Sequence, residues 1–431
     1  MIKIVNKILG IISIPFALIF VVIVRLISPI IIIRWCAIIS TRLGHFAENT
    51  NIYLSEKQLG KHDIKGKLIF DIFYFYPKIC NYQLAKMFKR KILVLPYFFM
   101  NNVNYINEFI INKFFKSNLH DIGYYRTEED LKRVENTNIK SLVDGIKKNL
   151  LFPPLSTNDS LNAQEIEKIN ISFTQKETEA GNKILKDFGI DIKKKMAGII
   201  LRDNDYLKKN YPKIDWSYHK IRHSDFSYYR DCAEKLAKLG YQVIVFGEKN
   251  ENFTNKDIIN YSNSVIRSDF MDIFLPSKLN FAVSSATGLD AIPIIFKVPI
   301  VEVSVAPLIS IRPYTNKIKI LFKTYYSKTL ARKLTLDEIF KFNLHDLQGN
   351  DLNDEIEFIH PSSKEITSAA LEIHEELSNN FNNTDEEENL QNNFKIKYKK
   401  LVDNSSEDRS LRNFTASIGK LFLKNNSYLI N

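Results

Sequence analysis

Cysteine is scarce in this chain of 431 residues: only Cys36, Cys80 and Cys232 occur, an odd number at wide spacing. Such a set excludes a disulfide framework and a zinc site built from cysteines, and it suits a reducing compartment. No His and Glu residues stand at the spacing of zinc enzymes, and no Gly-x-Ser-x-Gly elbow is present. The signatures of zinc-dependent and serine-dependent hydrolases are therefore missing.

Glycine-rich phosphate loops are also missing. The chain has neither the Gly-x-Gly-x-x-Gly of dinucleotide-binding domains nor the Gly-Lys-Ser/Thr of a Walker loop. It has no arginine-rich arm and no RNA-binding aromatic motif, and its basic residues are scattered, so nucleic acid is excluded as a partner. The net charge of +11 favours anionic lipid or phosphorylated small molecules, or it simply reflects a lysine-rich composition.

What is present is the composition of a globular protein. Apolar residues make up 45% of the chain and charged residues 25%, which excludes a disordered chain. The length is too great for one ordinary core and is natural for two α/β domains with additional segments.

The N-terminus carries a long apolar run. Residues Ile8 to Val24 contain no charge, Arg25 follows, and a second apolar stretch contains Pro29. Seventeen apolar residues are at the short end of what spans a bilayer. Pro15 and Pro29 argue against one straight helix through the whole stretch.

A membrane anchor is the preferred interpretation of this run, at the cytoplasmic membrane with the catalytic domains on the cytoplasmic side. Three alternatives remain: a cleaved signal peptide after Lys3 and Lys7, an in-plane anchor broken at Pro29, and a buried core helix. Basic residues stand on both sides of the run, Arg34 and Arg42 among them, so their distribution does not settle the topology.

Strands alternate with helices along the rest of the chain, which predicts parallel, wound sheets. The predicted strands are 35–40, 67–75, 91–98, 196–201, 241–247, a short one near Val265, 280–285 and 299–304. The predicted helices are 47–58, 77–89, one capped by Asp225, Met271 to Lys278, one after Gly288, and 362–377. The fold class is α/β, and the predicted parts are a membrane anchor over 1–33, an N-terminal α/β domain over 34–180, a C-terminal α/β domain over 181–378, and a loosely held polar tail over 379–431.

The first candidate site is Ser284-Ser285-Ala286-Thr287-Gly288, between a buried strand and a helix. Amides at a helix start, with hydroxyls beside them, suit a phosphate, although an ordinary capped turn has the same appearance. Gly247, at the end of strand 241–247, is counted with this donor-binding set.

The second candidate is Arg202, directly after strand 196–201. Ligands of open parallel sheets bind beyond the carboxyl ends of the strands, so a forked guanidinium there can meet a diphosphate. Asp203-Asn204-Asp205 follows and matches the Asp-x-Asp that holds a metal in some glycosyltransferases, a triplet that is frequent by chance.

Two loops add further candidates. The loop over 203–225 is aromatic and basic, and its His219 and Arg222 are candidate donor contacts. After the first strand, Arg42 to His45 are expected to form the loop before helix 47–58. In this segment, which continues to Asn49, His45 or Glu48 is a candidate to take a proton from an acceptor hydroxyl.

Four linked segments together resemble a family of bacterial glycosyltransferases associated with surface-polysaccharide synthesis. They are RLGHFAENTNIYLSE (42–56), LRDNDY (201–206), YHKIRHSDFSYYRDCAEKLAKLGYQVIVFG (218–247) and SDFMDIFLPSKLNFAVSSATGLDAIPIIFKVPIVEVSVAP (268–307), and the resemblance covers roughly 35–378.

More distantly, the second half is similar to the α-1,6- and protein-O-fucosyltransferase group. Arg202 matches the Arg of that group's His-x-Arg, while Ile200 stands in place of the His and leaves the donor open. The later elements of the group are matched by Asp269, Asp272, Ser284 and Ser285. This resemblance implies two facing Rossmann-like domains of the GT-B type, with the acceptor on the domain over 34–180 and the nucleotide sugar on the domain over 181–378. It also implies no metal cofactor and inversion at the sugar carbon.

The sequence therefore predicts transfer of a sugar from a nucleotide-diphosphate donor to a glycan or lipid-linked acceptor. Arg202 would neutralise the leaving diphosphate with help from Ser284, Ser285, Thr287 and Gly288. A nucleotide-sugar epimerase of the same fold and a non-catalytic, membrane-docked glycan-binding protein are the alternatives.

Overall fold

The computed structural model describes residues 2–114, 119–122, 163, 168–202, 221–222, 224–247, 253–346, 355–404 and 414–430. The chain divides into two compact units, Met1–Ser156 with Asn170–Ser172, and Thr157–Ile169 with Phe173–Asn431. Both units contain parallel strands alternating with helices, which confirms the predicted α/β class. That the two units face each other as GT-B domains stays a prediction.

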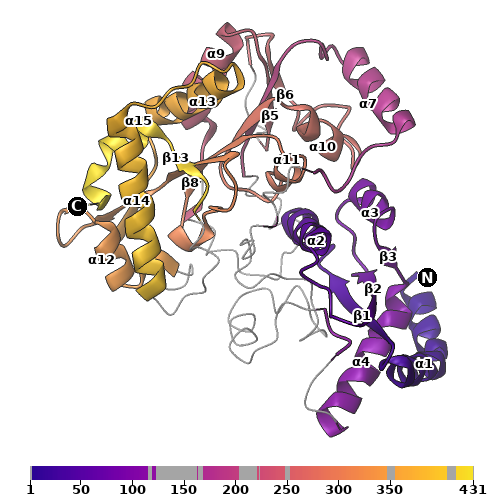
Figure 1. The fold of residues 1–431 in the computed structure, drawn as a ribbon. Coiled ribbons are helices and arrows are strands. Elements are labelled where there is room, and N and C mark those ends of the chain that lie inside the picture. Colours follow the sequence, from indigo (N-terminus) through magenta and orange to yellow (C-terminus); the bar gives the residue numbers. More distant parts are fainter. Residues whose placement is uncertain are drawn as a thin grey trace. The chain divides into compact units, whose positions relative to one another are not determined.

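The N-terminal unit has a parallel sheet between two layers of helices (Figure 1). Its strand order is β1 (Ile31–Ile38), β2 (Leu68–Phe75) and β3 (Leu93–Val94). On one face lie α1 (Ile2–Ile27) and α4 (Tyr97–Phe114), and on the other lie α2 (Leu43–Gln58) and α3 (Tyr82–Lys89). Side chains alternate along each strand, so Trp35 and Tyr74 pack beneath α1 while Phe73 packs against Tyr53 of α2.

Helix α1 is long and apolar enough to cross a membrane, judged by length and composition over Ile8–Ile27. It continues through Pro15 and ends before Pro29, so one helix does not run through the whole apolar stretch. The last apolar residues of that stretch belong to β1, which begins at Ile31. The predicted anchor over 1–33 therefore overlaps the first strand of the sheet.

Two local predictions for this unit are wrong. His45 lies in the first turn of α2 and not in a loop, because the helix begins at Leu43, four residues before the start of the predicted helix 47–58. The predicted strand 91–98 shrinks to the two residues of β3, since Pro96 cannot donate to a ladder and α4 follows at once.

The C-terminal unit is built on a seven-stranded sheet whose neighbouring strands are all parallel. Its order is β13 (Ser417–Ile418), β9 (Ile318–Phe322), β8 (Ile300–Val305), β7 (Phe281–Ser284), β4 (Met196–Ile200), β5 (Gln242–Phe246) and β6 (Ile258–Asn260). The inner strands read as continuous apolar runs because helices cover both faces.

Helices lie on both sides of this sheet (Figure 1). One side has α9 (Arg230–Lys238), α13 (Ser363–Leu377), α14 (Asp385–Asn404) and α15 (Lys420–Asn425), and the other has α7 (Gln175–Asp187), α10 (Met271–Phe274) and α11 (Ala291–Ile295). A small antiparallel sheet of β11 (Arg332–Lys333), β10 (Thr324–Ser327) and β12 (Ile356–Ile359) stands apart, with α12 (Leu336–Lys341) after β11. Asp225 caps the turn before α9, and Ser362 with Glu365 forms a capping box for α13.

Two predictions for this unit are wrong. The short strand is β6 and not the segment near Val265, whose side chain is 92% exposed and belongs to a loop. The segment after Ser378 is not a loose tail: Phe394, Tyr398 and Phe422 are buried in the core, and β13 pairs with the edge of the sheet. These apolar residues are spaced along a helix among many polar ones, which makes the segment look polar in composition while one face is buried.

Candidate functional site

The strand order of the seven-stranded sheet defines a switch point between β4 and β7. After β4 the chain adds β5 on one side of it and later β7 on the other. Loops that leave neighbouring strands in opposite directions open a crevice at the carboxyl edge, which is where ligands of such sheets bind. Arg202 follows β4 and the turn from Ser285 to Gly288 follows β7, so the fold brings these two predicted segments together.

Arg202 is held against the turn that follows β7. Its backbone N–H donates to the Ser285 hydroxyl at 2.9 Å, and its Nη2 donates to the Ala286 carbonyl at 2.6 Å. Ser285 N–H donates in turn to the Ile200 carbonyl, which continues the β4–β7 ladder past its last residue. Ala286 adopts φ +53°, an unfavourable conformation for a residue with a Cβ. The half-buried guanidinium is thus fixed in direction at the switch point.

A buried carboxylate organises the same turn. Asp290 accepts hydrogen bonds from the Ser284 hydroxyl at 3.1 Å and from the Thr287 backbone N–H at 2.7 Å. Its other oxygen lies 3.1 Å from Nη1 of Arg312, which also pairs with Glu302. Asp290 and Glu302 are fully buried, so the single positive charge of Arg312 offsets part of two buried negative charges.

The Asp290 carboxylate limits which groups of the turn can bind a phosphate. The amide of Thr287 was predicted to meet a phosphate, but the Asp290 side chain occupies it. Ser284 and Ser285 are 0% and 1% exposed and use their hydroxyls inside the protein, whereas Gly288 is exposed. The arrangement gives both serines a role in shaping the turn, and their contact with a phosphate stays a prediction. Sequence analysis missed Asp290, and its position three residues after Thr287, the spacing of a capping box, is the signal that could have identified it.

Gly247 lies where β5 ends beside Leu201. A Cβ added there would stand 2.0 Å from the Leu201 carbonyl oxygen, and the residue adopts φ +85°. Glycine is therefore required by the close approach of two chain segments, one of which leads into Arg202. Donor contact by Gly247 stays a prediction, while its packing role is visible.

Gly247→Ala is expected to lower the free energy of unfolding by about 2–4 kcal/mol, because the new methyl group must displace the Leu201 backbone. Urea unfolding of the full chain measures this. Gly240→Ala is the matched control, since Gly240 has a similar φ of +87° but nothing within 4 Å of an added Cβ. An equal loss in both variants would show that φ alone matters and would contradict the close-approach argument.

Arg222 extends the carboxyl edge toward β8. Its Nε donates to the Ala306 carbonyl at 3.1 Å and its Nη2 to the Ser310 hydroxyl at 2.8 Å, both in the segment that follows β8. The structure thus places Arg222 beyond a strand two positions from β4. His219 lies outside the described residues, as do Asp203, Asn204 and Asp205. Their predicted roles stay predictions.

Asp269 lies in the loop that precedes α10 and is exposed. This loop follows β6, two strands from β4 in the sheet order, and so it is at the far end of the same edge. Its neighbour Asp272 is half-buried and accepts a hydrogen bond from the Tyr261 hydroxyl at 2.7 Å. The resemblance to fucosyltransferases implies roles for Asp269 and Asp272, and both roles stay predictions.

A second polar cluster, missed by sequence analysis, lies past the carboxyl ends of β8 and β9. His360 contacts Ser304 Oγ through Nδ1 and Lys323 Nζ through Nε2, each at 2.9 Å, and its ring stacks on Tyr228. Ser304 sits in a β-bulge with φ +60°. Protonated Lys323 can only donate, so Nδ1 then carries the ring hydrogen and donates to Ser304. No sequence pattern joins these residues, because four separate segments supply Tyr228, Ser304, Lys323 and His360.

Lys323 makes stability depend on pH. It is 2% exposed, and burial lowers its pKa from 10.5 to about 7. The unfolded chain binds this proton more tightly than the folded chain does. Burial of the charged ammonium therefore lowers the free energy of unfolding by its full amount below pH 7, and this loss becomes smaller toward pH 10. Lys323→Met is therefore expected to be more stable than the wild type at pH 6. The difference in free energy of unfolding between this variant and the wild type should narrow by up to about 1.4 kcal/mol per pH unit above pH 7.

Unfolding at pH 6, 8 and 9.5 measures this gap, with Lys235→Met as the surface control that should show no such trend. A gap between Lys323→Met and the wild type that stays constant across these pH values would contradict the buried-charge argument.

In the N-terminal unit, His45 and Glu48 lie on the first turns of α2, directly after the carboxyl end of β1. They are three residues apart and so share one side of the helix. His45 is half-buried, whereas Glu48 is 3% exposed. Of the two, His45 is the more accessible to an acceptor hydroxyl.

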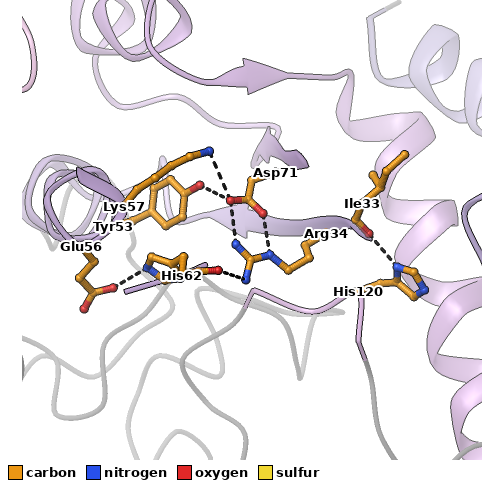
Figure 2. Close-up of polar contacts among 8 residues, drawn as sticks. All are labelled: Ile33, Arg34, Tyr53, Glu56, Lys57, His62, Asp71 and His120. Atoms are coloured by element: carbon orange, nitrogen blue, oxygen red, sulfur yellow. Dashed lines mark hydrogen bonds and ion pairs between the residues drawn. The ribbon is translucent and has the colours of Figure 1, made fainter. Parts of the chain in front are cut away.

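The same unit has a buried ionic cluster around Asp71 (Figure 2). Arg34 donates to both of its carboxylate oxygens, at 2.7 and 2.9 Å, and the Tyr53 hydroxyl donates at 2.5 Å. Lys57 lies 3.5 Å away. Burial alone would raise the pKa of Asp71, but the hydrogen bonds from Arg34 and Tyr53 and the two positive charges outweigh it and hold that pKa below its usual value.

This cluster locks the sheet to α2 and is not a second ligand site. Arg34 and Asp71 stand opposite each other in the middle of β1 and β2, away from the carboxyl ends where ligands bind. Nearby, His62 contacts Glu56 at 2.7 Å, and its backbone carbonyl accepts a hydrogen bond from Nη1 of Arg34 at 3.2 Å (Figure 2). The polar groups therefore satisfy one another within the protein.

Among the described residues, no three His, Cys, Asp or Glu side chains are grouped to hold a metal ion. Asp203 and Asp205 are not among these residues, so a reaction without metal stays a prediction.

Comparisons with known proteins give a weak likeness to a solved structure. No family model matches the chain, and no curated protein matches it. Among solved structures, it is similar to the glycosyl transferase family 9 protein from Veillonella parvula, with 11% identity and a TM-score of 0.42. The similarity covers 80% of this chain and 97% of that one. An identity and a TM-score this low do not assign the chain to that family.

Proposed function

We propose that the protein is a glycosyltransferase that moves a sugar from a nucleotide-diphosphate donor to a glycan or lipid-linked acceptor. The observation that carries the proposal is the fixed guanidinium of Arg202 at the switch point between β4 and β7. A diphosphate leaving group gains negative charge in the transition state, and a preorganised forked cation there lowers the barrier.

The other residues have supporting roles in this proposal. Asp290 and the serines hold the turn against which Arg202 rests. Arg222, anchored beyond β8, adds positive charge on the same edge. His219, from the aromatic and basic loop, and Gly288, in the turn after β7, are further proposed donor contacts. His45 takes the acceptor proton or orients the hydroxyl, with Glu48 one turn further along α2. Such an enzyme would have a GT-B arrangement, need no metal and invert the sugar carbon.

The proposal includes attachment to the cytoplasmic membrane through α1, with both units on the cytoplasmic side. Its support is the apolar helix over Ile8–Ile27, which has a mean hydropathy of 2.6. A lipid-linked acceptor would be reached from that position.

Thermal-shift titration with GDP, UDP, ADP and CMP, each with and without a chelator, tests the donor site. The full chain in mild detergent is required, because β1 begins at Ile31 and α1 covers Trp35. A nucleotide that binds only the folded state raises the Tm by mass action. Stabilisation by one diphosphate regardless of chelator is expected. No stabilisation by any of them would reject the donor site, and stabilisation only with metal would reject the metal-free reaction.

A further inference from the structure

Helix α1 has one large apolar surface that the protein does not cover. Only 22% of the apolar window in Ile8–Ile27 is buried, which is far from the burial of a core helix. Its exposed apolar side chains are Ile8, Leu9, Ile11, Ile12, Ile14, Phe16, Leu18, Ile19, Val22, Ile23 and Leu26. A continuous apolar surface of this kind indicates an interaction site.

The opposite stripe of α1 is bound to the N-terminal unit along most of the helix. Ala17, Val21 and Val24 are buried in a core cluster with Trp35 and Tyr74. These small and branched residues recur at the three- and four-residue spacing of one helix face. Removing α1 from this position would uncover the sheet beneath it.

Polar contacts reinforce this packing at both ends of the stripe. Asn102 of α4 donates to the Gly10 carbonyl at 2.7 Å and to the Ser13 hydroxyl at 2.9 Å. Near the other end, Arg25 Nη2 donates to Asn107 Oδ1 at 2.5 Å. The partners lie on α4, whose sequence also contains Asn104 and Glu108.

A helix that spans a bilayer must be surrounded by hydrocarbon over about 30 Å. For α1 to do so, it would have to leave the sheet and α4, or α4 would have to enter with its asparagines and Glu108. The first exposes the core around Trp35, and the second places several polar groups in lipid. Lying flat in the interface avoids both costs, because the apolar face meets lipid while the buried stripe stays on the protein.

The sheet extends the exposed apolar surface beyond the end of α1. Even-numbered residues of β2 face α1, since Ile72 and Tyr74 belong to its core cluster. Leu68 and Phe70 are on that same face and are 61% and 56% exposed. Next to them Lys67 donates to the Pro29 carbonyl, which places a cation at the rim of the surface. A cation at the rim complements an anionic lipid headgroup.

We infer that α1, Leu68 and Phe70 form a docking surface for the acyl-chain and headgroup boundary of an anionic bilayer, with α1 in the plane of the membrane and not across it. The inference rests on the membrane attachment proposed above and specifies its geometry. Because an in-plane helix does not cross the bilayer, both compact units then lie on the same side of it.

Vesicle flotation and nitroxide depth measurements on the full chain test this geometry. Vesicles of phosphatidylcholine with phosphatidylglycerol provide the surface. Spin labels are placed one at a time at Ile8→Cys, Ile19→Cys and Leu26→Cys in a Cys80→Ser background, where Cys36 and Cys232 are buried. These three exposed positions share one helix face, and the outer two are about 27 Å apart along the axis.

In-plane binding predicts that the three labels lie at the same shallow depth, within about 5 Å of one another, in the outer part of the leaflet. If the depths of the labels at Ile8→Cys and Leu26→Cys differ by most of their separation along the helix axis, the in-plane geometry is overturned. The proposed attachment to the membrane would then still hold. Failure of the unlabelled wild type to float with vesicles would instead reject the attachment itself. Concentration-dependent dimers without vesicle binding would also overturn the inference and assign the surface to a second copy of the chain.

A charged pair of variants ties the binding to this surface. Ile12→Asp with Ile19→Asp should reduce the vesicle-bound fraction at least about tenfold, since acidic residues are strongly disfavoured in the apolar layer. Ile192→Asp with Val265→Asp is the matched control, because both residues are exposed apolar side chains of the C-terminal unit. Equal loss of binding in both pairs would overturn the assignment to α1.

Discussion

Replacing Arg202 by alanine is expected to lower the rate of sugar transfer by about 10²–10³-fold with little loss of folding. The physical reason is that the guanidinium, fixed by Ala286, acts on charge that develops only as the diphosphate leaves. Steady-state transfer from the nucleotide sugar that stabilises the protein, with donor hydrolysis as a second readout, measures the loss.

Two further variants make the Arg202 result specific. Arg202→Lys keeps the charge but loses the forked geometry, so its rate should lie between wild type and Arg202→Ala. Arg230→Ala removes an exposed arginine of α9 and should leave the rate unchanged. Wild-type activity in Arg202→Ala would remove this residue from the proposed role. Products formed without any acceptor, other than simple hydrolysis, would point to an epimerase.

Replacing Asp290 by alanine is expected to destabilise the protein by about 3–5 kcal/mol, because Arg312 would lose its buried ion pair with this carboxylate. The Ser284 hydroxyl and the Thr287 amide would also lose their acceptor. Urea unfolding measures the stability, and the nucleotide titration measures the donor site. We expect the stabilisation by nucleotide to be lost as well, since the turn that supports Arg202 loosens.

Two control variants separate the hydrogen-bonding role of Asp290 from its negative charge. Asp290→Asn keeps an acceptor oxygen and should be intermediate in stability. Asp231→Ala changes an exposed acid on α9 and should shift stability by no more than about 0.5 kcal/mol. An unaltered free energy of unfolding in Asp290→Ala would contradict the role of the buried carboxylate.

Much of the C-terminal unit follows from local patterns in the sequence. The apolar runs that become β4, β5, β7 and β8 are buried on both faces, so each is recognisable without its neighbours. The ends of α13 and of the turn before α9 are equally local, because their caps lie within three residues of the groups they satisfy. The position of Arg202 at a strand end followed from the same information.

Segments whose burial depends on distant partners were predicted wrongly. The polar composition after Ser378 suggested a loose tail, yet Phe394, Tyr398 and Phe422 are buried beside Phe322 of β9. Only the assembled sheet offers the edge that β13 completes. Helix α2 similarly begins before the predicted residue, since its first turn is half-buried against the unit and not marked by a side-chain cap.

The sequence by itself determined the α/β class, most inner strands, the apolar N-terminal helix and Arg202 as a strand-end candidate, because these depend on residues close together in the chain. Only the tertiary structure decided that Asp290 pairs with Arg312 and that His360 contacts both Lys323 and Ser304. It also placed Arg34 opposite Asp71 on the neighbouring strand. It also decided which stripe of α1 is buried. Such pairings depend on register and on the closure of long loops, which no local pattern records.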